Sequence, residues 1–215
     1  MTYFVFIRHG ETDWNRQQRF QGQTDVPLNP AGLVQAAHLA RRLGPERADV
    51  LISSDLERAR QTAAPLASAW GLQPTLAPGL REQHFGVLEG LDVPTIKVQH
   101  PDLWARWLEH RADFALPGGE SLRQFHTRVL EAVRGLASAA GPGRTLAVVT
   151  HGGVLDILWR SAHGLPLDGL RACEIPNTGI NRLRWKNGTL DVVQWADVGH
   201  LDGAPAQAVL GAGKH

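Results

Sequence analysis

The sequence predicts an α/β protein, a three-layer sandwich with a mainly parallel central sheet, helices on both faces of the sheet and a C-terminal hairpin. Short apolar runs alternate along the chain with longer segments of helical periodicity, which is typical of a parallel sheet covered by helices. Near the C-terminus, alternating residues flank Asn187-Gly188, a pair typical of a two-residue hairpin turn. The 215 residues can form one good-sized core. We therefore expect a single domain over residues 1–201, followed by a flexible tail rich in small residues over 202–215.

Three apolar runs are expected to form the buried strands. Residues 2–7 (TYFVFI) are aromatic and β-branched and are bounded by Gly10. Residues 48–54 (ADVLISS) and 146–150 (LAVVT) have the same character. Each run is followed by a segment of helical pattern, which favours parallel pairing between them.

The first long helix is expected over residues 29–44. Asn29 suits the N-cap, Pro30 suits the first helical position, and Gly44 ends the pattern. The apolar residues of this segment repeat at helical spacing and are expected to face the core: Leu33, Ala36, Ala37, Ala40 and Leu43.

The other helices follow the later strands. Residues 54–71 (SDLERARQTAAPLASAWG) are expected to form a helix that Pro65 bends or interrupts. The segments at 103–110 (LWARWLEH) and 120–140 (ESLRQFHTRVLEAVRGLASAA) are amphipathic. A further helix, GVLDILWRSAHG at 153–164, is expected directly after the third strand.

Composition excludes several classes of protein. Hydrophobic residues make up 43% of the chain and charged residues 20%, as in ordinary globular proteins. The formal net charge of +1 argues against a dedicated nucleic-acid binder. No segment approaches the length of about 18 apolar residues that a membrane span needs. Cys173 is the only cysteine and the N-terminus lacks a signal-peptide pattern, so we expect a cytoplasmic protein.

Polar residues stand at the carboxyl ends of all three expected strands. The first strand ends on Arg8-His9-Gly10, the second on Ser53-Ser54, and the third on His151-Gly152-Gly153. Ligands of such sheets bind at the carboxyl ends of the strands. If the three strands are parallel neighbours, two histidines and an arginine meet at one edge.

These residue types suit phosphoryl transfer. A neutral imidazole is a nucleophile near pH 7 and needs no deprotonation, so His9 could attack phosphorus. The reaction otherwise needs positioning and positive charge on the phosphoryl oxygens. Arginine binds such oxygens with two parallel hydrogen bonds. Arg8 adjoins His9, and Arg58 lies in the first turns of the helix that follows the second strand.

The leaving oxygen needs a proton donor, for which the residues alone leave several candidates. Glu82 is one by its place in the loop GLREQHFG. Three other glutamates are equally permitted by the sequence: Glu11, Glu89 and Glu120.

Six motifs make the sequence resemble the histidine phosphatase superfamily, in its phosphoglycerate mutase-like branch. They occur in the family's order and cover most of residues 3–185. A single RHG would be a weak signal, but six ordered motifs are specific. The motifs are RHGETDWN (8–15), RFQGQTDVPLNPAG (19–32), SSDLERARQT (53–62), LREQHFGVLEG (80–90), PGGES (117–121) and VVTHGG (148–153).

The resemblance implies a role for each catalytic candidate. His9 would be the nucleophile that becomes phosphorylated. Arg8, Arg58 and His151 would bind the transferring phosphoryl group, and His151 would also stabilise charge in the transition state. Glu82 would be the general acid and then the base that activates water.

The resemblance also implies a set of binding residues. Asn15 would be a further phosphate donor, and Gln21 with Gly22 would line the substrate pocket. Gly152 could offer a backbone N–H to the phosphate. The frame SSDLERA selects Arg58 over the neighbouring Arg60.

Several other residues are expected to have no part in the chemistry. The remaining histidines are scattered without metal-binding spacing, so we expect no metal and no cofactor. His84 is expected to be a bystander at the pocket edge. Trp104 and Trp107 could cap the substrate, but packing is the more common use of such residues.

A phosphatase is favoured over a mutase. Mutases of the family tend to carry a longer insertion after the segment equivalent to LEGL, whereas residues 88–121 are short here and end in PGGES. IPNTGI at 175–180 resembles the phosphatase branch, while WADVGHL at 195–201 matches it only in part. The expected substrate is a small phosphorylated metabolite. The alternatives are a phosphoglycerate mutase dependent on 2,3-bisphosphoglycerate and a non-catalytic phospho-ligand binding module, and the sequence leaves a homo-oligomer open.

Overall fold

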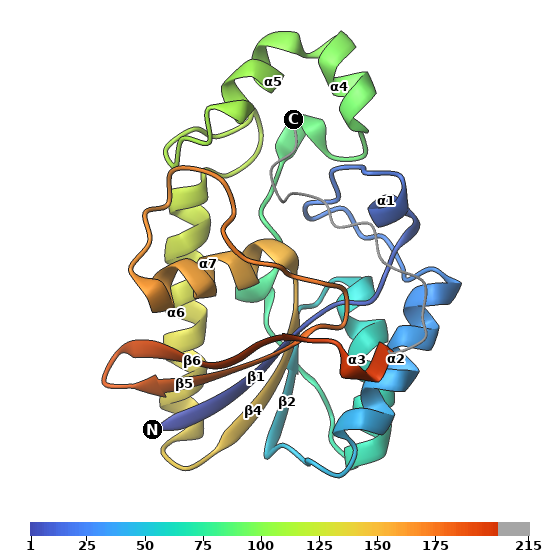
Figure 1. Cartoon of the computed structure of the whole chain (residues 1–215), viewed down its shortest axis with the longest axis vertical. Coiled ribbons are helices and arrows are strands. Elements are labelled where there is room, and N and C mark those ends of the chain that lie inside the picture. Colours follow the sequence, from blue (N-terminus) through green and yellow to red (C-terminus); the bar gives the residue numbers. More distant parts are fainter. Residues whose placement is uncertain (202–215) are drawn as a thin grey trace.

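A computed structural model describes residues 1–201 of the chain, and the tail expected at 202–215 lies outside them. Within the described residues, six strands form one sheet in the order β3-β2-β4-β1-β5-β6 (Figure 1). The strands are β1 (Thr2–Arg8), β2 (Val50–Ser53), β3 (Thr75–Leu76), β4 (Thr145–Thr150), β5 (Ile180–Lys186) and β6 (Thr189–Asp197).

The sheet is parallel at its centre. β1 pairs with β4, β4 with β2 and β2 with β3 in parallel, whereas β1–β5 and β5–β6 are antiparallel. β5 and β6 form the hairpin expected around Asn187-Gly188, where φ is 51° and 85°. Two successive left-handed residues give the turn whose twist matches that of the strands.

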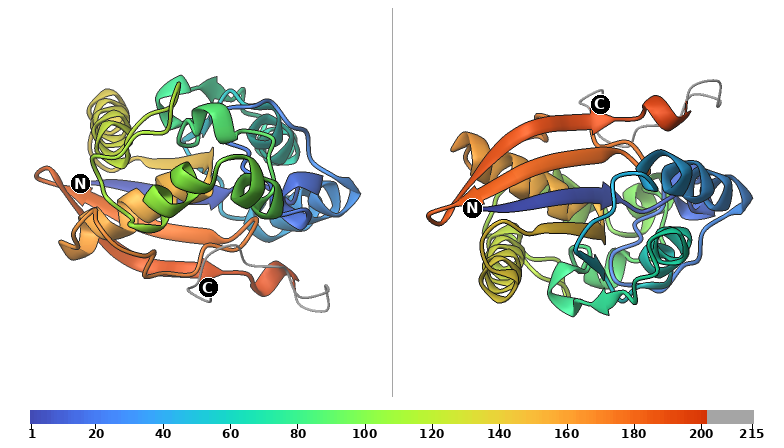
Figure 2. Two further views of the ribbon diagram at one scale, coloured as in Figure 1. Left: turned by 90° about the horizontal axis from the view of Figure 1, so that it is seen from above. Right: turned by 90° about the horizontal axis from the view of Figure 1, so that it is seen from below.

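Helices cover both faces of the sheet (Figures 1 and 2). Phe4 and Phe6 of β1 pack with α6 and α7, and Val5 and Ile7, on the opposite face, pack with α2 and α3. This alternation along one buried strand separates two apolar layers, so the predicted fold class is confirmed. The helices are α1 (Asp13–Arg16), α2 (Pro30–Leu43), α3 (Glu57–Trp70), α4 (Val93–Gln99), α5 (Pro101–Leu108), α6 (Leu122–Ala140) and α7 (Gly152–His163).

The buried face of α2 differs from the expected one. Asn29 caps the helix by accepting from Gly32 N–H and Pro30 opens it, as predicted, but Leu33 is 51% exposed and Ala37 is exposed too. A close backbone contact sets this rotation, because a Cβ at Gly32 would lie 2.1 Å from the carbonyl oxygen of Glu11. The buried residues are Gly32, Gln35, Ala36, Leu39 and Leu43.

Pro65 does not interrupt α3. The helix runs from Glu57 to Trp70 with the proline inside it, and ends at Gly71 in the left-handed conformation, with φ of 62°. Burial of Ala59, Ala63 and Leu66 against the sheet holds the helix together across the proline, which cannot donate a backbone hydrogen bond.

A small cap of helices lies beyond the carboxyl ends of the strands (Figure 1). The sequence predicts α5 here, but not α4, which Asp92 caps by accepting from Thr95 N–H. Leu88, Ile96 and Leu116 form a separate apolar cluster beneath these helices. No helix within residues 1–201 is long and apolar enough to cross a membrane.

Candidate active site

The carboxyl ends of the three central strands bring the two histidines together. β1 and β4 are adjacent and parallel, with Arg8 opposite Thr150, so the next residue of each strand lies at the same edge. The rings of His9 and His151 have their centroids 5.2 Å apart. The convergence expected from strand ends is therefore present.

His9 is buried and its ring is oriented by its own turn. Nδ1 lies 2.7 Å from the carbonyl oxygen of Gly10, to which it donates as the N–H tautomer, so Nε2 presents a lone pair. The backbone is fixed by Asn177, whose Nδ2 donates to the His9 carbonyl at 2.9 Å, and by Thr62, whose hydroxyl accepts from Gly10 N–H. Burial, with the charges of Arg58 and Arg8, lowers the pKa of His9 well below 6.5. The imidazole is therefore neutral at pH 7.

His151 is held from the neighbouring strand. Its Nε2 lies 2.7 Å from the hydroxyl oxygen of Ser54, which follows β2. Its Nδ1 is buried without a hydrogen-bond partner among residues 1–201. Burial first, then Arg58, lowers the pKa of His151. A buried ring nitrogen that has no partner within the described residues is suited to a ligand oxygen.

The two arginines reach the site from different elements and bind backbone carbonyls instead of carboxylates. Arg8 Nη1 donates to Ile175 at 2.6 Å, and Arg58 donates to Gly22 at 2.7 Å and Thr24 at 2.9 Å. In the part of the chain described, neither guanidinium forms a salt bridge, and each Nε is buried without a partner.

The charge of these arginines is available to an anion. Burial lowers the pKa of both Arg8 and Arg58 to about 10, so both stay protonated at pH 7. Arg58 is fully buried and Arg8 is partly buried, and cations in such places are costly unless anions compensate them. The nearby charge of Glu82 offsets part of this cost. The site therefore favours a dianionic group such as a phosphoryl.

The carboxylate of Glu82 contacts the first turn of α7, which His151 caps. Gly153 N–H donates to both carboxylate oxygens, at 3.1 and 3.0 Å, and Gln83 N–H donates to one of them at 2.9 Å. A Cβ on Gly152 would lie 3.6 Å from Arg8 Nε and 3.8 Å from a Glu82 oxygen, which places Gly152 between these two side chains.

The other three candidate acids are engaged elsewhere. Glu11 accepts from Asn29 at the start of α2, and Glu120 pairs with Arg128. Glu89 accepts from the backbone N–H groups of residues 23 and 85 and from a threonine hydroxyl, and so joins two loops. Of the four glutamates, Glu82 is the one whose carboxylate accepts from the first turn of α7, next to His151.

The expected binding residues lie on the segment that follows β1. Asn15 is buried in α1, where its Oδ1 accepts from the N–H and hydroxyl of Thr12, so its amide nitrogen is the end free to donate. Gln21 accepts from the same hydroxyl at 3.0 Å. Gly22 adopts φ of 50° and its carbonyl holds Arg58, so it shapes the site through that arginine.

Residues beside the site keep structural roles. Trp107 packs edge-on against Phe20 and Phe85, with ring centroids 5.6 and 5.4 Å apart, so it belongs to the cap. His84 Nε2 lies 3.7 Å from Glu89. No three His, Cys, Asp or Glu side chains in residues 1–201 come together as metal ligands.

Sequence reasoning missed several residues that support the site. The sequence marks Ser54 only as the end of a strand, and no neighbouring residue indicates its contact with His151. Thr62 and Asn177 fix the His9 turn from 52 and 168 residues away. Arg128 contacts the Glu82 loop from α6, where it looks like an ordinary helix arginine. Long-range contacts of this kind leave no periodic signal in the sequence.

Comparisons with known proteins identify the family of the chain. The family model of the histidine phosphatase superfamily (branch 1) matches residues 4–198. The chain belongs to this superfamily.

Individual relatives also match the chain over most of its length. The chain is 36% identical over 202 residues to phosphoglycerate mutase-like protein 4 of Arabidopsis thaliana, covering 92% of this chain and 86% of the relative. It is 35% identical over 204 residues to a metal-independent phosphoserine phosphatase of the same plant, covering 94% and 84%. The solved structure of Bacillus stearothermophilus YhfR, 30% identical, aligns with a TM-score of 0.87 over 94% of this chain and all of that one.

Proposed function

We propose that this protein is a phosphatase that hydrolyses small phosphomonoesters without a metal ion, through a phosphohistidine formed at His9. The observation that carries the proposal is the meeting of a neutral, buried His9 with Arg8 and Arg58, neither of which forms a salt bridge within residues 1–201. Membership of the superfamily and the phosphatase among its relatives support it.

The first half-reaction transfers the phosphoryl group to the protein. Nε2 of His9 forms a bond to phosphorus while the bond between phosphorus and the leaving oxygen breaks. Glu82 gives its proton to that oxygen, which departs as an alcohol. Arg8, Arg58 and His151 bind the phosphoryl oxygens, and the Gly10 carbonyl holds the tautomer of the nucleophile.

The second half-reaction releases phosphate. Glu82, now a carboxylate, takes a proton from a water molecule whose oxygen bonds to phosphorus. The bond between phosphorus and Nε2 breaks, and His9 returns as a neutral imidazole. Asn15 and the N–H of Gly152 supply further donors to the phosphate, and Gln21 with Gly22 borders the rest of the substrate.

Phosphoglycerate mutase activity is the second candidate. The name of a plant relative favours it, and the same residues can return the phosphoryl group to a substrate instead of to water. The short segment between Leu88 and Ser121 favours the phosphatase. Phosphoserine is a substrate to test first, from the name of the other plant relative. Cytoplasmic location and lack of nucleic-acid binding stay predictions.

The test compares substrates and traps the intermediate. The protein is offered p-nitrophenyl phosphate, phosphoserine, and 3-phosphoglycerate with and without 2,3-bisphosphoglycerate. We expect release of inorganic phosphate, negligible isomerisation, and an acid-labile phosphate on His9 located by mass spectrometry. His9→Ala should lose at least about 10³-fold in kcat. Isomerisation faster than phosphate release would instead establish the mutase, and turnover by His9→Ala would reject the nucleophile.

A further inference from the structure

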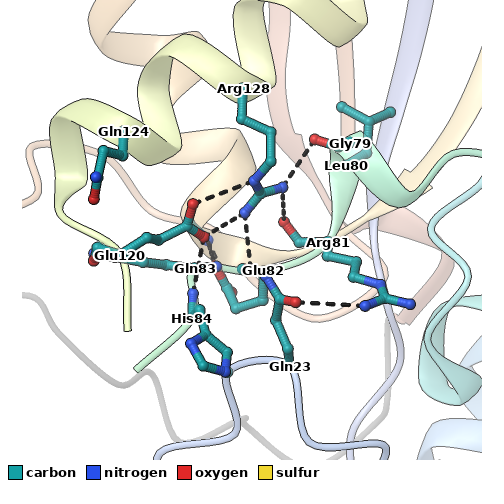
Figure 3. Close-up of polar contacts among 12 residues, drawn as sticks. Gln23, Gly79, Leu80, Arg81, Glu82, Gln83, His84, Glu120, Gln124 and Arg128 are labelled. Carbon is teal, nitrogen blue, oxygen red and sulfur yellow. Dashed lines mark hydrogen bonds and ion pairs between the residues drawn. The ribbon is translucent and has the colours of Figure 1, made fainter. Parts of the chain in front are cut away.

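Arg128 of α6 reaches the loop that carries Glu82 and binds it at three carbonyl groups (Figure 3). Its Nη1 donates to the carbonyls of Gly79 at 2.9 Å and Arg81 at 3.1 Å, and its Nη2 donates to Glu82 itself at 3.2 Å. A single planar guanidinium therefore fixes the backbone on the N-terminal side of the proposed acid and at the acid itself.

Glu120 completes the contact from the other direction (Figure 3). It pairs with Arg128, with side chains only 17% and 25% exposed. Its Oε1 accepts from His84 N–H at 2.9 Å, and its backbone carbonyl accepts from Gln83 Nε2 at 3.0 Å. The ion pair thus binds the loop on both sides of Glu82.

Arg128 is itself held rigidly. α6 packs on the sheet through Phe125 and Val129, which are fully buried, and the guanidinium lies 4.9 Å from the centre of the Phe125 ring. The segment from Gly79 to His84 has little regular structure, so its carbonyls depend on side-chain donors. The position of the Glu82 carboxyl at Gly153 is then set by contacts with α6 and α7.

We propose that Arg128, together with Glu120, is the positioning residue for Glu82 and so for proton transfer to the leaving oxygen. The inference rests on the proposed function, since it gives Glu82 the role of acid. Lysine cannot replace the arginine, because one ammonium cannot reach three carbonyls and a carboxylate in a planar fork. Displacement of the Glu82 carboxyl would slow the reaction only of esters whose leaving group needs a proton.

The experiment measures how kcat/KM depends on the leaving group. Arg128→Met and Arg128→Lys are compared on an alkyl ester, glycerol 3-phosphate, and on p-nitrophenyl phosphate, whose leaving group needs no proton. We expect a loss of at least about tenfold on the alkyl ester and less than about threefold on the aryl ester. kcat/KM is used because it stops at the first irreversible step and excludes hydrolysis of the phosphohistidine.

Two further variants make the result specific. Arg134→Met, an exposed arginine on the same helix, should behave as the unchanged protein on both esters. Glu120→Gln should reproduce the selective loss, and adding it to Arg128→Met should cost little more, because the two residues act as one unit.

The outcomes separate this inference from the proposed function. Glu82→Gln is measured alongside. If it loses equally on the two esters, Glu82 is not the acid, and both the acid step of the proposed function and the positioning role of Arg128 fail. If Glu82→Gln is selective while both folded Arg128 variants lose equally on the two esters, or lose nothing, only the positioning role is overturned. Should circular dichroism show that Arg128→Met is unfolded, Arg128→Lys and Glu120→Gln decide by the same criterion.

Discussion

At the scale of single residues, Ser54 and His151 show how one hydrogen bond can set the chemistry of an imidazole. His151 Nδ1 is buried and has no hydrogen-bond partner within residues 1–201, whereas Nε2 lies 2.7 Å from the Ser54 hydroxyl. A serine that donates to Nε2 places the imidazole proton on Nδ1, which can then donate to an oxygen of a bound phosphoryl group. The hydroxyl therefore selects the tautomer that can bind an anion.

Replacing Ser54 with alanine should lower kcat/KM for p-nitrophenyl phosphate by about tenfold, the equivalent of one hydrogen bond of roughly 1.4 kcal/mol. Ser53→Ala is the matched control, because the Ser53 hydroxyl is equally buried but donates to the Ser54 carbonyl and not to a histidine. Steady-state kinetics and melting temperatures of both variants check this. Equal losses of kcat/KM in Ser54→Ala and Ser53→Ala would mean that activity depends on the structure of the strand end and not on the tautomer of His151.

At the scale of elements, the first turn of α7 packs closely against the proposed acid. His151 is its N-cap, and the N–H of Gly153 donates to the Glu82 carboxylate. A Cβ on Gly153 would lie 2.1 Å from a Glu82 oxygen and 2.9 Å from the Phe125 ring. Glycine is therefore required here by the close approach of the acid to the helix.

Gly153→Ala should displace Glu82 and lower kcat/KM for glycerol 3-phosphate by at least about tenfold, with a smaller effect on p-nitrophenyl phosphate. Gly135→Ala, within α6, is the control because a Cβ there meets nothing within 4 Å. That variant should keep full activity and gain about 1 kcal/mol of stability, a rise in Tm of about 2–4 °C. An active Gly153→Ala with unchanged preference would show that the acid tolerates the methyl group.

At the scale of the whole molecule, burial of the site links folding to pH. His9 and His151 have pKa values lowered mainly by burial, whereas the unfolded chain titrates near 6.5. Below that pH the unfolded state binds more protons than the native state, so stability is complete above about 6.5 and falls as the pH decreases. Ion-paired carboxylates such as Asp55, whose pKa is lowered by Arg81, titrate at lower pH.

We therefore expect the free energy of unfolding to decrease between pH 6.5 and pH 5 by up to about 1.4 kcal/mol per pH unit for each of the two histidines. Urea denaturation at a series of pH values measures this slope. His9→Ala and His151→Ala should each flatten it, whatever their effect on stability at pH 7. A flat profile for the unchanged protein in this window would contradict the burial of neutral histidines.

The features that the sequence predicts correctly are mostly those that depend on neighbouring residues. The strands, the capped start of α2 and the Asn187-Gly188 turn depend on residues that lie next to one another. Their patterns can therefore be recognised in the sequence without a structure. The parallel order then places His9 and His151 at one edge, because carboxyl ends of parallel strands coincide.

Only the tertiary structure decided which side chains complete the site. The exposure of Leu33 follows from the contact between Gly32 and Glu11, two backbone segments about twenty positions apart. Among four candidate acids, packing against α7 singles out Glu82, and Arg128 reaches its loop from a different helix. Contacts between distant segments depend on how elements pack, and packing leaves no period or spacing in the chain itself.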